Sequence, residues 1–130
     1  MLRRIATVIA AASALILGVA GTAYAHDKTV ELDEWFYNYA LGDATWTENG
    51  DTLKVCDDRA DGYGIRAYIY VPYTGDEGNG TVLVKVSDPS YDGSCVSTTK
   101  NISETTQISL KVCQYAGATI GECTWEQVTR

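Results

Sequence analysis

The alternation of apolar and polar residues along short segments is the feature that most constrains the fold of this chain. The clearest example runs from Ile65 to Val71, where Ile, Ala, Ile and Val alternate with Arg, Tyr and Tyr. Because successive side chains of a strand point to opposite faces, this pattern predicts a half-buried β-strand. After residue 25, no apolar residue recurs at helical spacing over three turns. The sequence therefore predicts an all-β protein.

The other strands, and the turns between them, follow from the same pattern. The segment 48–51, Glu-Asn-Gly-Asp, predicts a hairpin turn because asparagine and glycine tolerate the positive backbone angles of tight turns. Pro72 predicts the end of the strand that begins at Ile65, and the glycine-containing segment 73–80 predicts a loop. Further strands are expected at 30–32, 44–47, 52–56, 82–86, from 96, at 108–112 and at 124–128, with an irregular aromatic segment at 35–39. About seven or eight short strands separated by frequent turns predict an antiparallel β-sandwich.

The first 25 residues have the three parts of a secretory signal peptide. Arg3 and Arg4 form a basic start, residues 5–20 are an apolar run, and Ala23-Tyr24-Ala25 has small residues at the positions that a signal peptidase reads. The apolar run is short for a membrane span, and no stop-transfer pattern follows it. We expect cleavage after Ala25, no membrane anchor afterwards, and a single secreted domain at residues 26–130. The style of the signal is bacterial.

The charge of the expected mature chain excludes two classes of partner. The first 25 residues hold two of the ten basic residues and none of the seventeen acidic ones, so residues 26–130 carry eight basic and seventeen acidic side chains. A surface this acidic repels the phosphates of nucleic acids and of anionic lipids. We therefore expect an acidic, extracellular protein that binds no nucleic acid.

All four cysteines lie after the signal, and an exported chain meets an oxidising compartment. Two disulfides are therefore the expected state, and three pairings are open from the sequence alone. The sequential pairing is favoured. A hairpin would bring Cys113 and Cys123 together, while Cys56 and Cys95 would join the central strand pair to a later loop. A zinc site is disfavoured because no Cys-x-x-Cys pair occurs and His26 is the only histidine.

A single histidine also argues against most catalytic arrangements. Cleavage would place His26 at the amino terminus, where its amine and ring could hold copper as in the brace of copper-dependent polysaccharide oxygenases, but that brace needs a second histidine. Ser-His-Asp and Cys-His arrangements would have to use the same terminal residue as their base. Pairs of carboxylates carry little information in a chain with seventeen acids. We expect a protein that is not an enzyme and uses no cofactor.

Asp57, Asp58 and Asp61 are the candidate metal ligands, and calcium is the ion they would suit. Asp57, Asp61 and Gly62 match three positions of the helix-loop-helix calcium motif. Arg59 stands where the third-position ligand should be, so the motif itself fails and only an irregular site remains. The alternative is that the aspartates accept hydrogen bonds from their own backbone in a turn.

Arg66, Tyr68 and Tyr70 are the candidate binding residues. They fall on the polar face of the strand that begins at Ile65. Exposed tyrosines stack on sugar rings or anchor protein interfaces, and sandwich carbohydrate-binding modules use such platforms. The alternative is that these tyrosines only reflect strand propensity, or that a second layer covers the face.

The segments 49–57 and 59–67 carry a resemblance to known proteins. Asn-Gly-Asp-Thr-Leu-Lys-Val-Cys-Asp followed by Arg-Ala-Asp-Gly-Tyr-Gly-Ile-Arg-Ala resembles small secreted β-rich proteins of actinobacteria, in which a strand ending in aspartate leads through an Ala-Asp-Gly turn into another strand. The resemblance implies export and a β fold. Proteins of this kind mostly lack an assigned function.

These observations favour a secreted, noncatalytic β-sandwich that acts by binding an extracellular protein or polysaccharide. One alternative is a carbohydrate-binding module-like protein that uses the tyrosine face. Another is a proteinaceous inhibitor of a secreted hydrolase, which would present residues 115–122, between Cys113 and Cys123, as its inhibitory loop.

Overall fold

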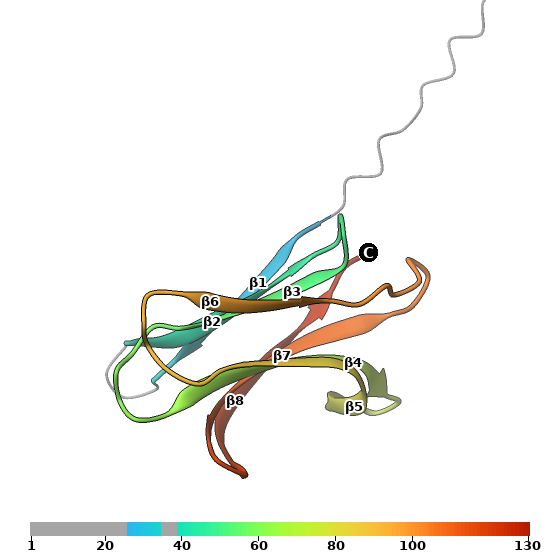
Figure 1. Cartoon of the computed structure of the whole chain (residues 1–130). Coiled ribbons are helices and arrows are strands. Elements are labelled where there is room, and N and C mark those ends of the chain that lie inside the picture. Colours follow the sequence, from blue (N-terminus) through green and yellow to red (C-terminus); the bar gives the residue numbers. More distant parts are fainter. Residues whose placement is uncertain (1–25, 35–38) are drawn as a thin grey trace, which may run out of the picture.

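The computed structural model of the chain describes residues 26–34 and 39–130, which form a β-sandwich of eight strands in two antiparallel sheets. The first sheet has the order β1-β2-β3-β6, with β1 (Lys28–Asp33), β2 (Ala40–Thr47), β3 (Thr52–Asp57) and β6 (Cys95–Thr99). The second has the order β5-β4-β7-β8, with β4 (Gly64–Tyr73), β5 (Asp76–Asp88), β7 (Ile108–Ala116) and β8 (Thr119–Val128). Figure 1 shows the two sheets as facing layers.

The core lies between the two sheets and is built by the period-two pattern of the strands. Trp46 of β2 is fully buried in this core, with Ile69 of β4 and Leu110 of β7 contributed by the opposite sheet. Burying apolar area of this kind contributes roughly 25 cal/mol per Å², so these inward positions supply most of the favourable free energy of folding. Within the described residues, no helix is long and apolar enough to cross a membrane.

The expected strands are all present, several of them longer than the sequence pattern indicated. The hairpin turn at 48–51 is confirmed, since Thr47 pairs with Thr52 and the Asp51 N–H donates to the Glu48 carbonyl at 3.3 Å. The positive backbone angles fall on Gly50 (φ 103°) and Asp51 (φ 46°). The signal segment 1–25 and residues 35–38 of the aromatic segment lie outside the described residues.

The expectation that Pro72 ends a strand and that 73–80 is a loop is wrong. β4 continues through Pro72 to Tyr73, and β5 begins at Asp76, so only two residues separate the strands. Proline is tolerated because β4 pairs with β7 only as far as Tyr70. The β7 side of the strand therefore needs no N–H donor at Pro72.

Both favoured disulfides are confirmed, and each lies within one sheet. Cys56 of β3 stands directly opposite Cys95, the first residue of β6, and Cys113 of β7 stands opposite Cys123 of β8. The first bridge therefore joins two neighbouring strands, where the sequence indicated a strand and a loop. Neither disulfide crosses from one sheet to the other. Two disulfides are compatible with an extracellular location.

Candidate functional site

The outer face of the β5-β4-β7-β8 sheet carries a row of four side chains, one from each strand. The strand register places Tyr68 opposite Lys85 on one side and opposite Lys111 on the other, and Lys111 opposite Trp125. Residues directly opposite each other on paired strands share a face and lie within about 5.5 Å at Cβ. We refer to Lys85, Tyr68, Lys111 and Trp125 as the outer row. It alternates cations with aromatic rings.

Beside the outer row, Arg66 of β4 is held in one orientation. Its Nε donates to the Ser87 hydroxyl at 2.8 Å, and its guanidinium carbon lies 4.0 Å from the centre of the Tyr115 ring. A guanidinium over an aromatic face gains a favourable electrostatic contact and keeps its edge donors free for a ligand. The predicted site residue Arg66 is therefore half-buried and ordered.

Tyr70 lies on the same face, but its side chain is only 2% exposed. The cover comes from β5, in which residues 77–79 have no partner on β4, because Asp76 pairs with Tyr73 and Gly80 with Pro72. We refer to residues 77–79 as the β5 bulge. The Tyr70 hydroxyl donates to the Glu77 carbonyl at 2.7 Å. Burial raises the pKa of the Tyr70 phenol above its ordinary value.

The exposure assumed for Tyr70 from strand alternation therefore does not hold. Tyr68 keeps part of its ring accessible, whereas Tyr70 supports the β5 bulge from beneath. Extra residues in a bulge bend a strand and re-aim its backbone, which is how β5 comes to lie over a face that alternation alone would leave open.

The β5 bulge is fastened to the outer row by two contacts. Lys111 Nζ donates to the Gly78 carbonyl at 3.0 Å and to Asn79 Oδ1 at 3.3 Å. The indole of Trp125 packs against Gly78 so closely that a Cβ there would lie 2.9 Å from the indole nitrogen. Glycine is therefore required at this position for the close approach. Trp125 itself is 37% exposed.

Between the β5 bulge and strands β7 and β8 lies an open cleft of about 180 Å³. Its lining combines rings, a disulfide and a few polar groups: Tyr68, Tyr70, Gly78, Asn79, Gly80, Val82, Lys111, Cys113, Ile120 and Cys123. Pockets for drug-sized ligands measure roughly 300–1,000 Å³, so this cleft accommodates one ring or one side chain.

Lys111 and Trp125 are residues that sequence reasoning missed. Trp125 stands two positions after Cys123 on one strand, so alternation places both on one face, but which face that is depends on the pairing with β7. Lys111 lies between the apolar residues Leu110 and Val112, an ordinary position for a polar residue of a half-buried strand, so no local signal marks it.

In the described part of the chain, Asp57, Asp58 and Asp61 of the acidic turn after β3 do not bring their oxygens within 4.8 Å of one another. Asp57 is 4% exposed and accepts from the Arg59 N–H at 3.0 Å, and its Oδ2 has no hydrogen-bond partner. Asp61 accepts from the Tyr63 N–H at 2.9 Å and from the Gln114 amide at 3.1 Å. Asp57 and Asp61 thus each accept a hydrogen bond from the backbone N–H two residues later, as aspartates do in turns without a bound calcium ion.

Burial changes the protonation of this region. It raises the pKa of the Asp57 carboxyl, and the nearby carboxylates of Asp61 and Asp88 raise it further. Asp58 is exposed and lies near Asp43 of β2, whose carboxyl pKa is raised chiefly by burial and also by Asp58. No guanidinium or ammonium group pairs with Asp57 among the described ion pairs.

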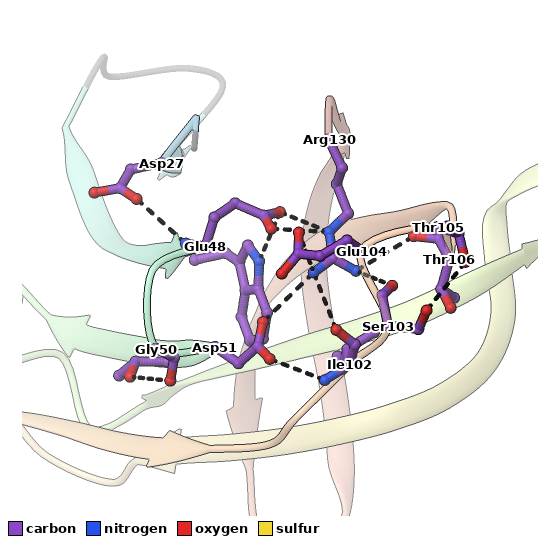
Figure 2. A network of polar contacts seen from close by, with 12 residues as sticks. Asp27, Glu48, Gly50, Asp51, Ile102, Ser103, Glu104, Thr105, Thr106 and Arg130 are labelled. Atoms are coloured by element: carbon purple, nitrogen blue, oxygen red, sulfur yellow. Dashed lines mark hydrogen bonds and ion pairs between the residues drawn. The ribbon is translucent and has the colours of Figure 1, made fainter. Parts of the chain in front are cut away.

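Where the structure is described, the three carboxylates that bring oxygens within 4.8 Å of one another are Glu48, Asp51 and Glu104, a set that sequence reasoning did not single out. Figure 2 shows that the guanidinium of Arg130 occupies this cluster. It lies 2.9 Å from Glu48, 3.4 Å from Asp51 and 3.5 Å from Glu104. Trp46 Nε1 donates to Glu48 at 3.0 Å, which ties the cluster to the core. A cation site here is therefore filled by the protein's own arginine.

Comparison with known proteins found no matching family model, no matching curated protein and no matching solved structure. The outer face, with its cleft, aromatic rings and cationic side chains, is the candidate functional site that the geometry itself supplies.

Proposed function

We propose that this protein is a secreted, noncatalytic binding protein of the carbohydrate-binding-module type, which takes a sugar ring in the cleft of the outer face. The observation that carries the proposal is the pairing of Tyr68 and Trp125 on either side of Lys111, with the β5 bulge as one wall of the cleft. Aromatic rings present flat apolar surface to the C–H face of a sugar, and amine and amide groups beside them bind its hydroxyls.

The cleft's composition supports a role in binding. Its lining contains no carboxylate, no imidazole and no free thiol, since Cys113 and Cys123 are joined. Glycoside hydrolysis generally needs two carboxyl groups that flank the bond to be broken, and nucleophilic catalysis needs a base beside the nucleophile. Neither arrangement is available among the lining residues.

The extracellular part of the proposal rests on two supports. Residues 1–25 have the pattern of an export signal, and the two disulfides are of the kind that persists in oxidising compartments. A polysaccharide on or outside the cell would then be the partner.

The test is retention of the disulfide-bonded protein on a panel of polysaccharides, neutral and acidic, together with isolated cell wall. We expect retention on at least one member, and its loss in the double variant Tyr68→Ala, Trp125→Ala. The matched control is Tyr63→Ala, Tyr91→Ala, which removes two exposed rings away from the cleft. Retention that survives the first double variant would rule out this face, and no retention on any member would rule out the proposed function.

A second candidate function is inhibition of a secreted hydrolase, favoured by the hairpin of β7 and β8. This hairpin extends beyond β4, because the last β4 residue pair on that side is Gly64 with Tyr115, while β7 and β8 pair as far as Ala116 and Thr119 (Figure 1). Ile120 near its tip is 42% exposed, and the Cys113–Cys123 disulfide braces its base. Residues 115–122 thus form a stiff hairpin end.

A rigid, protruding hairpin with an exposed apolar side chain suits insertion into an enzyme cleft, because little conformational entropy is lost on binding. The test is a panel of secreted proteases and amylases assayed with the protein and with Ile120→Asp. Inhibition that Ile120→Asp abolishes is the expected result for this candidate, and a panel without any inhibition removes it.

A further inference from the structure

The outer face holds three cationic side chains that have no carboxylate partner in the described part of the chain. The five ion pairs there use only three basic residues, Lys28, Arg59 and Arg130. Arg66, Lys85 and Lys111 are absent from them, and all three project from the outer face. The chain has seventeen acidic residues, so a local group of cations without carboxylate partners favours a negatively charged ligand at this face.

These cations are held in place by neutral groups, which leaves their charge uncompensated. Lys111 donates to a backbone carbonyl and to the Asn79 side chain, and Arg66 donates to the Ser87 hydroxyl while stacking on Tyr115. Lys85 is exposed. Two of the three positive groups are thus ordered before a ligand arrives, which lowers the entropic cost of binding an anion.

The direction of the outer row favours a saccharide chain over a peptide. The row runs across the strands, and neighbouring strands lie about 4.8 Å apart, which is close to the length of one hexose unit. Successive sugars along the row would therefore meet cation, ring, cation and ring in turn. An extended peptide would instead pair with a sheet edge, where backbone donors and acceptors are open.

Two acids beside Tyr70 influence the side from which a negative group can approach this face. Asp76 and Glu77 lie at the tip of the β4–β5 hairpin, next to Tyr70, and Asp76 accepts from the Asn79 amide at 3.0 Å. They would repel an anion at the tip. Lys85 lies in the outer row, and Arg66 lies on the side of the row away from the tip.

We infer that the ligand of the outer face is a polysaccharide that bears carboxylates, such as one built of uronic acid units. This inference rests on the proposed function and deepens it. Sugar rings lie on Tyr68 and Trp125, and their carboxylates contact Lys111 and Lys85, with Arg66 available to a neighbouring unit.

The test compares polygalacturonate with its fully methyl-esterified form, which has the same rings without the charge, by titration calorimetry on the disulfide-bonded protein. We expect the acid form to bind at least tenfold more tightly, with an affinity that falls as salt rises. Lys85→Gln, Lys111→Gln should weaken the acid form roughly tenfold. The control variant Lys54→Gln, Lys100→Gln removes two exposed lysines outside the outer face and should leave affinity unchanged.

The outcomes separate this inference from the proposed function. Equal binding of the acid and the ester overturns the anionic ligand and leaves sugar binding in place. Polyglutamate bound as tightly as polygalacturonate, without loss in Tyr68→Ala, overturns the inference in favour of an acidic protein partner. If neither form binds, the inference fails, and the neutral members of the polysaccharide panel then decide whether the proposed function fails with it.

Discussion

Arg130 and Glu48 form an ion pair, 2.9 Å from nitrogen to oxygen, in which the two side chains are only 4% and 3% exposed. Arg130 also donates to the carbonyls of Ser103 and Ile102, in the segment between β6 and β7. The pair therefore links the end of β2, the β6–β7 segment and the chain after β8 at one end of the sandwich (Figure 2).

Removing the cation from this pair should destabilise the fold strongly. Arg130→Met leaves the Glu48 carboxylate buried with the Trp46 N–H as a donor but without a cation, so we expect the free energy of unfolding in urea to fall by about 3–5 kcal/mol. The control is Lys28→Met, which removes the surface pair with Glu126 and should cost at most about 1 kcal/mol. Similar losses in the two variants would show that burial does not set the strength of the Arg130 pair.

The two disulfides should differ modestly in their contribution to stability. They close segments whose ends are 10 and 39 residues apart. In the chain-entropy model, replacing both cysteines of each bridge by serine costs about 3 kcal/mol for Cys113–Cys123 and about 4 kcal/mol for Cys56–Cys95. Urea unfolding of the two double variants measures this. A larger loss from the shorter bridge would mean that local β7–β8 contacts depend on it.

The buried Asp57 carboxyl should make the protein less stable as pH rises through the acid range. Burial raises the pKa of this carboxyl in the folded state above its ordinary value, so the folded chain holds this proton to a higher pH than the unfolded chain. The stability linked to this proton is complete below the unfolded pKa and is lost as pH rises through the folded pKa.

Asp57→Asn should therefore flatten this part of the profile and raise the melting temperature at neutral pH, because no buried charge then forms. The amide can still accept from the Arg59 N–H. Asp33→Asn, at an exposed position, is the control. A lower melting temperature for Asp57→Asn at pH 7 would point to a bound cation at Asp57, and addition of millimolar calcium and of chelator would then identify it.

The Tyr70 hydroxyl should hold the β5 bulge in place. Tyr70→Phe keeps the buried ring but removes the bond to the Glu77 carbonyl, at a cost of about 1 kcal/mol. We expect faster amide hydrogen exchange at residues 77–79 and weaker ligand binding at the cleft. Tyr73→Phe, whose ring is 55% exposed, should change neither. Unchanged exchange in Tyr70→Phe would mean that Lys111 and Trp125 suffice to hold the bulge.

The fold was largely predictable because its signals are local. Alternation identified the strands, the turn residues separated them, and the expected export implied paired cysteines. The errors occurred where partners distant in sequence decide the outcome. Pro72 can lie in a strand because the pairing of β4 with β7 stops at Tyr70, and that register cannot be read from residues near the proline.

The candidate site was less predictable than the fold. Tyr68 and Arg66 could be assigned to one face of a strand, but the outer row that contains Tyr68 depends on the register of three strand pairs. The cover over Tyr70 depends on a bulge in a segment that read as a loop. The Arg130 contact with Glu48 joins residues 82 positions apart, and no local pattern marks it.

The Cys56–Cys95 bridge would hold the chain together after proteolytic cleavage between the two cysteines. The exposed turn between β4 and β5 lies between these two cysteines, as does the acidic turn after β3. A single cleavage anywhere from residue 57 to residue 94 leaves two pieces that remain joined through the disulfide. A protease that nicks the tip beside the cleft would therefore release no fragment, and the two pieces would separate on a denaturing gel only after reduction.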